Sequence, residues 1–232
     1  MPGEASTGVW ALVAAAGRGE RLAGGRPKAF AKLAGRPLLA ESLERLDGSE
    51  WVEAIVVVAP PDWEEPTILL AEELGLGKVT ACVAGGATRV ESVRLGLAEI
   101  PADAAAVLVH DAARPLLPPE VIDRVLVALG EGWDAVVPAL AVIDTLKRGV
   151  DGQVVETLDR SDLYAAQTPQ AFLADALRRA LGGGAAASDC AALVEAAGGR
   201  VRLVQGDPML LKVTSDDDLA LVEALLAAPA GT

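Results

Sequence analysis

The chain has 232 residues, enough for one α/β domain with a sizeable core or two small ones, and its formal net charge of −13 at pH 7 argues against a general nucleic-acid binder. One histidine and two cysteines, without metal-ligand spacing, indicate neither a zinc site nor a disulfide framework. The uncharged run at 5–17 is too short to span a bilayer and no basic region precedes it, so we expect a cytoplasmic protein with no membrane partner.

The first expected element is a buried strand at 9–15, and the loop after it is rich in glycine and basic residues. Between Arg18 and Arg36 six cations stand against one acid, Glu20, in a chain that is acidic overall. Glycine lets backbone N–H groups approach a ligand closely, and a concentration of cations attracts phosphates. The loop is therefore a candidate phosphate site, with a solvated basic loop as the alternative.

The loop matches neither of two common phosphate-binding motifs. The Walker motif needs Lys-Ser/Thr directly after its second glycine, but Gly25 is followed by Arg-Pro-Lys. The dinucleotide fingerprint fits Gly17 and Gly19 but has Leu22 in place of the third glycine, and Pro27 disfavours a continuous helix. These residues argue against an NAD-dependent oxidoreductase.

Strands and helices alternate as far as residue 139, which predicts an α/β fold with a doubly wound, mostly parallel sheet. The expected helices are 37–46, 62–74 with Asp62 as its cap, 88–100 and 118–129, and the expected strands are 54–59, 79–84, 105–109 and 135–139. Ligands of such sheets bind beyond the carboxyl ends of the strands. We therefore expect the functional residues at those ends.

The alternation stops at 143–160, where the sequence predicts a projecting β-hairpin that turns at Asp151-Gly152. Counting outward from the turn places Lys147 opposite Glu156. An isolated two-stranded hairpin is marginal in water, so we expect this arm to pack on a second subunit and to form a homodimer. The expected elements beyond it are helices near 171–181 and 189–197, strands near 201–205 and 210–213, and a closing helix from Asp216.

Two polar clusters follow the third and fourth expected strands. Gly85 to Arg89, with Ser92 one turn further, could present backbone groups to a base or a ribose, although a turn with a Thr88 helix cap explains the same residues. Asp111 follows the fourth strand, with Arg114 three residues later. This acid could bind substrate or Mg²⁺, or it could form a local ion pair. We expect the preceding His110 to be structural.

Taken together, these stretches resemble one family, the 2-C-methyl-D-erythritol 4-phosphate cytidylyltransferases. The resemblance is carried by AAAGRGERL with PKAF, GGATRVES, VHDAARP, IDTLKR and TLDR of the arm, QTPQ, and LKVTSDDDLAL, spread from residue 14 to 221. It implies a Rossmann-like nucleotidyltransferase fold over 1–232 as a single cytidylyltransferase domain, with 143–160 as a dimerisation arm. It also implies transfer of CMP from CTP to 2-C-methyl-D-erythritol 4-phosphate by direct in-line attack, with Mg²⁺ or another divalent cation.

The resemblance further implies a role for each matching residue. The catalytic cations would be Arg21 and Lys28 on the CTP side and Arg160 and Lys212 on the side of the attacking phosphate. The nucleotide-binding residues would be Ala15, Ala16, Gly17, Gly19, Gly86, Ala87, Arg89 and Ser92. The substrate-binding residues would be Asp111, Arg114, Thr145, Thr168 and Ser188, with Thr145 and Arg160 reaching into the neighbouring subunit's site. The metal ligands stay open, with Asp111 as a candidate.

The chain departs from the family pattern at three places. Ala14 stands in place of a proline, Ala87 in place of an acid, and Ser188-Asp189-Cys190 in place of Thr-Asp-Glu, which leaves Cys190 in doubt as a substrate contact. The alternatives are a ribitol-5-phosphate cytidylyltransferase, a nucleotidyltransferase for another base, and a nucleotide-binding regulatory module without catalysis.

Overall fold

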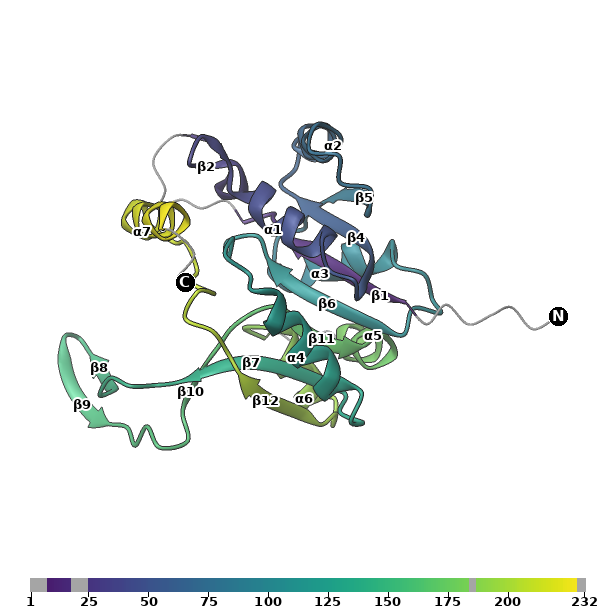
Figure 1. Cartoon of the computed structure of the whole chain (residues 1–232). Helices are drawn as coiled ribbons and strands as arrows, with labels where there is room; N and C mark the ends of the chain where they lie inside the picture. The colour runs from purple at the N-terminus through teal and green to yellow at the C-terminus, as the bar shows by residue number, and fades with distance from the viewer. Residues whose placement is uncertain (1–7, 18–24, 184–186, 229–232) are drawn as a thin grey trace.

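The computed structural model describes residues 8–17, 25–183 and 187–228, and Figure 1 shows their arrangement. An eight-stranded mixed sheet runs through these residues in the order β10-β7-β11-β6-β1-β4-β5. Strands β10 and β11 pair with one edge of β7, and β12 pairs with its opposite edge. The mostly parallel α/β architecture expected from the alternating elements is confirmed. No helix among the described residues is long and apolar enough to cross a membrane.

The parallel half of the sheet consists of four neighbouring strands. They are β6 (Ala106–Asp111), β1 (Val9–Ala14), β4 (Val52–Ala59) and β5 (Val79–Ala84). All side chains of β6 and nearly all of β4 are buried, because helices cover both faces of this half. These apolar runs of β-branched residues and alanine therefore form strands in the centre of the sheet.

Successive residues of β1 point into two different cores, as the pleat of a strand requires. Ala11 and Val13 pack with α1 (Leu38–Asp47), α2 (Glu64–Glu73) and α4 (Pro119–Leu129). Leu12 packs on the opposite face with α3 (Arg89–Ala98), α5 (Ala174–Gly182) and α6 (Cys190–Ala196).

Helix α2 begins after Trp63, which is at the cap position. Asp62, the expected cap, instead has a left-handed backbone (φ 68°).

The second half of the sheet is mixed. Strand β7 (Ala135–Ala141) is joined to β6 by the antiparallel β11 (Gln170–Leu173), and β10 (Tyr164–Ala166) also pairs with β7. Strand β12 (Val201–Gln205) runs parallel to β7 on its other side. The helix expected at 171–181 therefore begins late, because Phe172 is fully buried between two strands that supply backbone hydrogen bonds.

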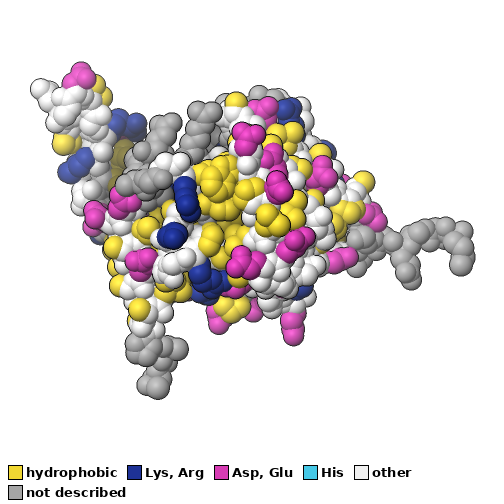
Figure 2. Space-filling model, turned by 90° about the horizontal axis from the view of Figure 1, so that it is seen from above, with side chains coloured by type: hydrophobic (Ala, Val, Ile, Leu, Met, Phe, Trp, Pro, Cys, Tyr) yellow, Lys and Arg dark blue, Asp and Glu magenta, His cyan; other side chains and the backbone are white. Residues whose placement is uncertain are grey.

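The arm is a separate two-stranded sheet that stands clear of the body (Figures 1 and 2). Its strands are β8 (Lys147–Val150) and β9 (Gln153–Thr157), and positive φ angles at Asp151 (50°) and Gly152 (78°) confirm the turn. The expected pairing of Lys147 with Glu156 is wrong. A register shift between Arg148 and Gly149 places Arg148 opposite Glu156, while Lys147 donates to Thr157.

The C-terminal helix α7 (Asp216–Ala227) packs on the segment that follows Lys28. That segment is a 3₁₀ turn, η1 (Lys28–Phe30), and a short hairpin of β2 (Lys32–Leu33) and β3 (Arg36–Pro37). Val222 of α7 joins a small apolar cluster with residues of this hairpin, and Glu223 accepts a hydrogen bond from the Ala34 N–H at 2.8 Å. Lys28 begins η1 and Lys212 lies shortly before α7, so the packing of α7 on this segment brings the surroundings of the two lysines together.

The strand expected at 210–213 is not formed. Leu210 and Val213 are buried, but the segment is irregular, and the Val213 N–H donates to the Ala113 carbonyl rather than to a ladder. This segment crosses the end of β6 and ends at Ser215, whose side chain caps α7 in a reciprocal capping box with Asp218.

Candidate active site

A cleft of about 830 Å³ lies at the carboxyl ends of the parallel strands. Residues 14–17 at the end of β1, Pro61 after β4, 86–89 after β5 and 111–113 at the end of β6 line it. Lys28, Lys212 and Thr214 enter it from outside the sheet. These segments therefore meet at the carboxyl ends of the strands, where the sequence analysis expected the functional residues.

The backbone after β1 forms one wall of the cleft. The Ala15 N–H donates to the Val58 carbonyl at 2.9 Å, so the first strand keeps its pairing up to the point where the cleft begins. The neighbouring Gly85 lies so close that a Cβ there would be 2.2 Å from the Ala16 Cβ. Ala15, Ala16 and Gly17 line the cleft, and their nucleotide-binding role stays a prediction. Gly19 and Arg21 fall outside the described residues.

The loop between β5 and α3 is held by its own side chains. The Gly86 N–H donates to Ser92 Oγ at 3.1 Å, and Ser92 Oγ donates to the Thr88 carbonyl at 2.9 Å. The Ala87 N–H donates to the Glu91 carboxylate at 2.9 Å, and Thr88 caps the helix. Ser92 therefore shapes the loop from a buried position, and the predicted Thr88 cap is confirmed.

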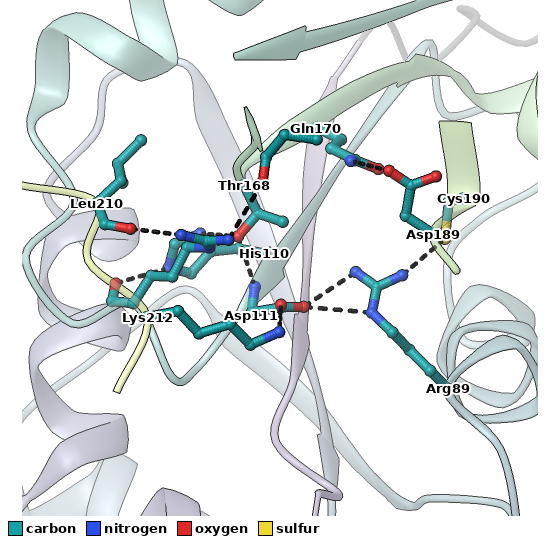
Figure 3. A network of polar contacts seen from close by, with 11 residues as sticks. Arg89, His110, Asp111, Thr168, Gln170, Asp189, Cys190, Leu210 and Lys212 are labelled. Atoms are coloured by element: carbon teal, nitrogen blue, oxygen red, sulfur yellow. Dashed lines mark hydrogen bonds and ion pairs between the residues drawn. The ribbon is translucent and has the colours of Figure 1, made fainter. Parts of the chain in front are cut away.

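Asp111 is the buried carboxylate at the centre of the site (Figure 3). Its Oδ1 accepts from Arg89 Nη2 at 2.9 Å and Nε at 3.3 Å, and its Oδ2 accepts from Lys212 Nζ at 2.6 Å. Burial by itself would raise the pKa of Asp111, but the charges of Arg89 and Lys212 outweigh it and hold that pKa well below its usual range. The carboxylate is therefore ionised at neutral pH.

Arg114 does not form the local ion pair with Asp111 that its spacing allowed. Its guanidinium donates to the carbonyl oxygens of Leu210 and Ala166, so it joins the loop after β6 to the segment before Lys212 and to the base of the arm. Arg114 is not among the residues that line the cleft.

The remaining expected substrate residues lie apart from this cleft. Thr145 and Arg160 are exposed at the base of the arm, and Ser188 is exposed before α6. Thr168 is 4% exposed, and its hydroxyl accepts from the Asp111 N–H at 3.0 Å. Within one chain the cleft thus gathers Lys28, Lys212, Arg89 and Asp111, and not the arm residues.

Thr214 and Cys190 carried no functional assignment in the sequence analysis. Thr214 lines the cleft, and its N–H and hydroxyl both donate to Asp218, so the Ser215–Asp218 capping pattern was the available signal. Cys190 is fully buried, and its Sγ accepts from Arg89 Nη1 at 3.5 Å. Burial raises the pKa of the Cys190 thiol, so the thiol is neutral. Cys190 lies behind Arg89 and is not among the residues that line the cleft.

The parallel strands, the glycine-containing loops and the cations at the strand ends define the class of α/β enzymes that bind nucleotides through their phosphates. The family model of 2-C-methyl-D-erythritol 4-phosphate cytidylyltransferase (IspD) matches residues 9–228. The chain belongs to this family and is therefore a nucleotidyltransferase.

Relatives and solved structures agree with this assignment. The chain is 48% identical over 225 residues to the cytidylyltransferase of Frankia casuarinae, covering 96% of this chain and 83% of that protein. It is 49% identical to the enzyme of Saccharopolyspora erythraea, covering 94% of this chain and 99% of that protein. The crystal structure of the Thermus thermophilus enzyme superposes with a TM-score of 0.78 at 35% identity, covering 94% and 98% of the two chains. A crystal structure of 4-diphosphocytidyl-2C-methyl-D-erythritol synthase gives a TM-score of 0.83 at 34% identity, covering 95% and 99%.

Proposed function

We propose that the chain transfers CMP from CTP to 2-C-methyl-D-erythritol 4-phosphate, forming 4-diphosphocytidyl-2-C-methyl-D-erythritol and pyrophosphate. The observation that carries the proposal is that Lys28, Lys212 and the buried Asp111 line one cleft, in a chain that matches the family over nearly its whole length. Such a cleft can hold two phosphate groups against their mutual repulsion.

The proposed chemistry needs no side-chain nucleophile. An oxygen of the acceptor's phosphate attacks the α-phosphorus of CTP, a new P–O bond forms in line with the bond to the β-phosphate, and that bond breaks to release pyrophosphate. Negative charge moves to the oxygen that leaves. In this scheme Lys28 neutralises the triphosphate, Lys212 orients the attacking phosphate, and Arg21 assists on the CTP side.

Lys212 has to exchange partners during this reaction. In this structure its Nζ donates to Asp111 at 2.6 Å, and its side chain is 43% exposed. A dianionic phosphate competes well for an ammonium group that is still partly solvated. Asp111 keeps Arg89 as a partner through two hydrogen bonds when Lys212 turns to the substrate.

The residues of the cleft are compatible with Mg²⁺ held mainly by the nucleotide. Among the described residues no group of three or more His, Cys, Asp or Glu could hold a metal ion. Mg²⁺ commonly binds one or two carboxylates together with substrate phosphates. Asp111 is the carboxylate that would hold it, and the ion would supply further neutralisation of the triphosphate.

We also propose that the chain forms one cytidylyltransferase domain whose arm at 143–160 mediates a homodimer. The described part of the arm exposes large apolar side chains, which at Ile143, Val154 and Val155 are 81%, 63% and 57% exposed. Thr145 and Arg160 do not line the cleft of their own chain. A second subunit would cover the apolar side chains and bring these two residues to a cleft. The cytoplasmic location stays a prediction from the sequence.

Mixed dimers test the arm. The Arg160→Ala and Lys28→Ala variants should each be nearly inactive, whereas their mixture should recover up to about a quarter of the wild-type activity, because one of the two sites in a heterodimer keeps both residues. Subunit exchange is followed by mass spectrometry of one isotope-labelled variant. Exchange without recovery would show that Arg160 acts within its own chain.

The substrate is tested by pyrophosphate release with Mg²⁺, crossing CTP, ATP, GTP and UTP with methylerythritol 4-phosphate and ribitol 5-phosphate. Release with CTP and methylerythritol 4-phosphate alone is expected. Release with ribitol 5-phosphate would move the chain to the other acceptor while keeping the roles of the lysines. Binding of CTP without release in any combination would favour the regulatory module.

A further inference from the structure

The one histidine of the chain has no role in the chemistry above, although it directly precedes Asp111. His110 is fully buried at the end of β6. Its Nε2 lies 3.1 Å from the Arg114 carbonyl oxygen, and its Nδ1 lies 3.2 Å from Thr168 Oγ1. A carbonyl oxygen only accepts, so Nε2 carries a proton. The ring is fully buried, and its two nitrogens face a carbonyl oxygen and a hydroxyl, neither of which compensates a buried positive charge, so the ring is neutral and Nδ1 is an acceptor.

This protonation state fixes the direction of the Thr168 hydroxyl. The hydroxyl proton points to His110 Nδ1, and a lone pair of Oγ1 accepts from the Asp111 N–H at 3.0 Å. The hydrogen bonds therefore run in one direction, from the Asp111 N–H through Thr168 to His110 and on to the Arg114 carbonyl. Figure 3 shows Asp111, Thr168 and His110 side by side. We call these three bonds the His110 relay.

The relay continues the sheet at the point where its ladder ends. Strand β11 pairs with β6 in an antiparallel register whose last pair is Gln170 with Val109. If this register continued by two residues past the last pair, Thr168 would lie opposite Asp111. There the Thr168 side-chain hydroxyl, rather than a backbone carbonyl, accepts from the Asp111 N–H. The bond thus extends strand pairing to the residue that enters the cleft.

The relay differs in kind from the other contacts of Asp111. The carboxylate is held by Arg89 and Lys212, and in the proposed function Lys212 leaves for a phosphate. The relay instead holds the backbone of the same residue, through the hydrogen bond from the Asp111 N–H to the Thr168 hydroxyl. We propose that His110 and Thr168 are positioning residues, which keep Asp111 in place for the reaction through a directional chain of hydrogen bonds. The kinetic part of this inference rests on the proposed function.

The single histidine makes the relay directly observable. In protein labelled with ¹⁵N-histidine, the two ring nitrogens give one set of signals, whose shifts distinguish the tautomers and the charged ring. The expected wild-type spectrum at pH 7.5 is that of a neutral ring protonated at Nε2, with Nδ1 as a hydrogen-bonded acceptor. A ring protonated at Nδ1, or a charged ring, overturns the relay whatever the activity.

Variants of Thr168 test the link to catalysis. Thr168→Val removes the hydroxyl at nearly constant volume, and we expect the Nδ1 signal to shift toward that of an unbonded nitrogen and kcat to fall roughly tenfold. Thr168→Ser should restore both. Ser42→Ala is the matched control, because Ser42 Oγ is a buried hydroxyl that donates to the same loop at the Ala112 carbonyl, at 3.3 Å, outside the relay. It should leave the spectrum and kcat unchanged.

The outcomes separate this inference from the proposed function. Wild-type kcat in a folded Thr168→Val protein, or an equal loss in Ser42→Ala, overturns the positioning role. If Thr168→Val does not fold, Thr168→Ser and the wild-type spectrum still decide, since failure of serine to keep the Nδ1 hydrogen bond contradicts the relay. A wild-type protein that transfers CMP to neither acceptor removes the proposed function, and the spectrum remains the test of the hydrogen bonds.

Discussion

Replacing Lys212 by methionine tests the centre of the site most directly. The change keeps much of the length of the side chain and removes one charge. Asp111 would retain Arg89, whose Nη2 lies 2.9 Å from Oδ1, but Oδ2 would lose its partner at 2.6 Å. The variant therefore leaves a buried carboxylate with half of its neutralisation and leaves the attacking phosphate without its proposed cation.

The two consequences differ in size. At an effective dielectric constant of about 20, opposite charges at 2.6 Å attract by roughly 6 kcal/mol, but desolvation offsets most of this. Because the Lys212 side chain is 43% exposed, we expect the free energy of unfolding to fall by only about 1–2 kcal/mol. We expect kcat/KM to fall by about 10²–10³-fold, the usual loss when one group that stabilises developing charge is removed.

The assay is steady-state pyrophosphate release, together with urea unfolding of the same samples. Lys78→Met is the matched control, because Lys78 Nζ donates to the Ser49 carbonyl at 2.7 Å and Lys78 is not among the residues that line the cleft. This control should lose some stability and no activity. A folded Lys212→Met protein with kcat/KM within about threefold of wild type, or an equal loss in Lys78→Met, would refute the reasoning.

Three further results are expected. Burial lowers the pKa of His110 from 6.5 to about 4, so as the pH falls the unfolded chain takes up a proton on His110 before the folded protein does. The free energy of unfolding should therefore be level above about pH 6.5 and fall by about 3 kcal/mol toward pH 4. The fall should be smaller in His110→Gln. Gly85→Ala would place a Cβ 2.2 Å from the Ala16 Cβ, so the CTP KM should rise about tenfold or more, whereas Gly77→Ala, with nothing within 4 Å, should not change it. Ser215→Ala should lower the free energy of unfolding by about 1 kcal/mol through loss of the α7 cap, and Ser161→Ala, which removes an exposed contact to Asp159, by less than about 0.5 kcal/mol. Urea titrations check the first and third results, and a flat pH dependence or an unchanged Ser215→Ala would contradict them.

The order of the elements followed from local chemistry. The apolar runs at Val52–Ala59 and Ala106–Asp111 are buried on both faces. A continuous apolar run of this kind is typical of a strand covered by helices on both sides, so it could be predicted from the sequence. The turn at Asp151-Gly152 was predictable because both positions need positive φ angles, which these residues accept. Since parallel strands end at the same edge of the sheet, the sequence also predicted that Gly86, Arg89 and Asp111 would meet there.

Tertiary structure decided what no local pattern encodes. Asp111 pairs with Lys212, 101 residues away, rather than with the nearby Arg114, because the irregular segment before α7 crosses the end of β6. Phe172 lies in a strand rather than a helix because two neighbouring strands bind the backbone around it. The partners of a side chain depend on which distant segments the fold brings to it. The sequence alone determined which residue types form the site and at which strand end each of them lies. Only the packed chain determined which charges and hydroxyls hold one another.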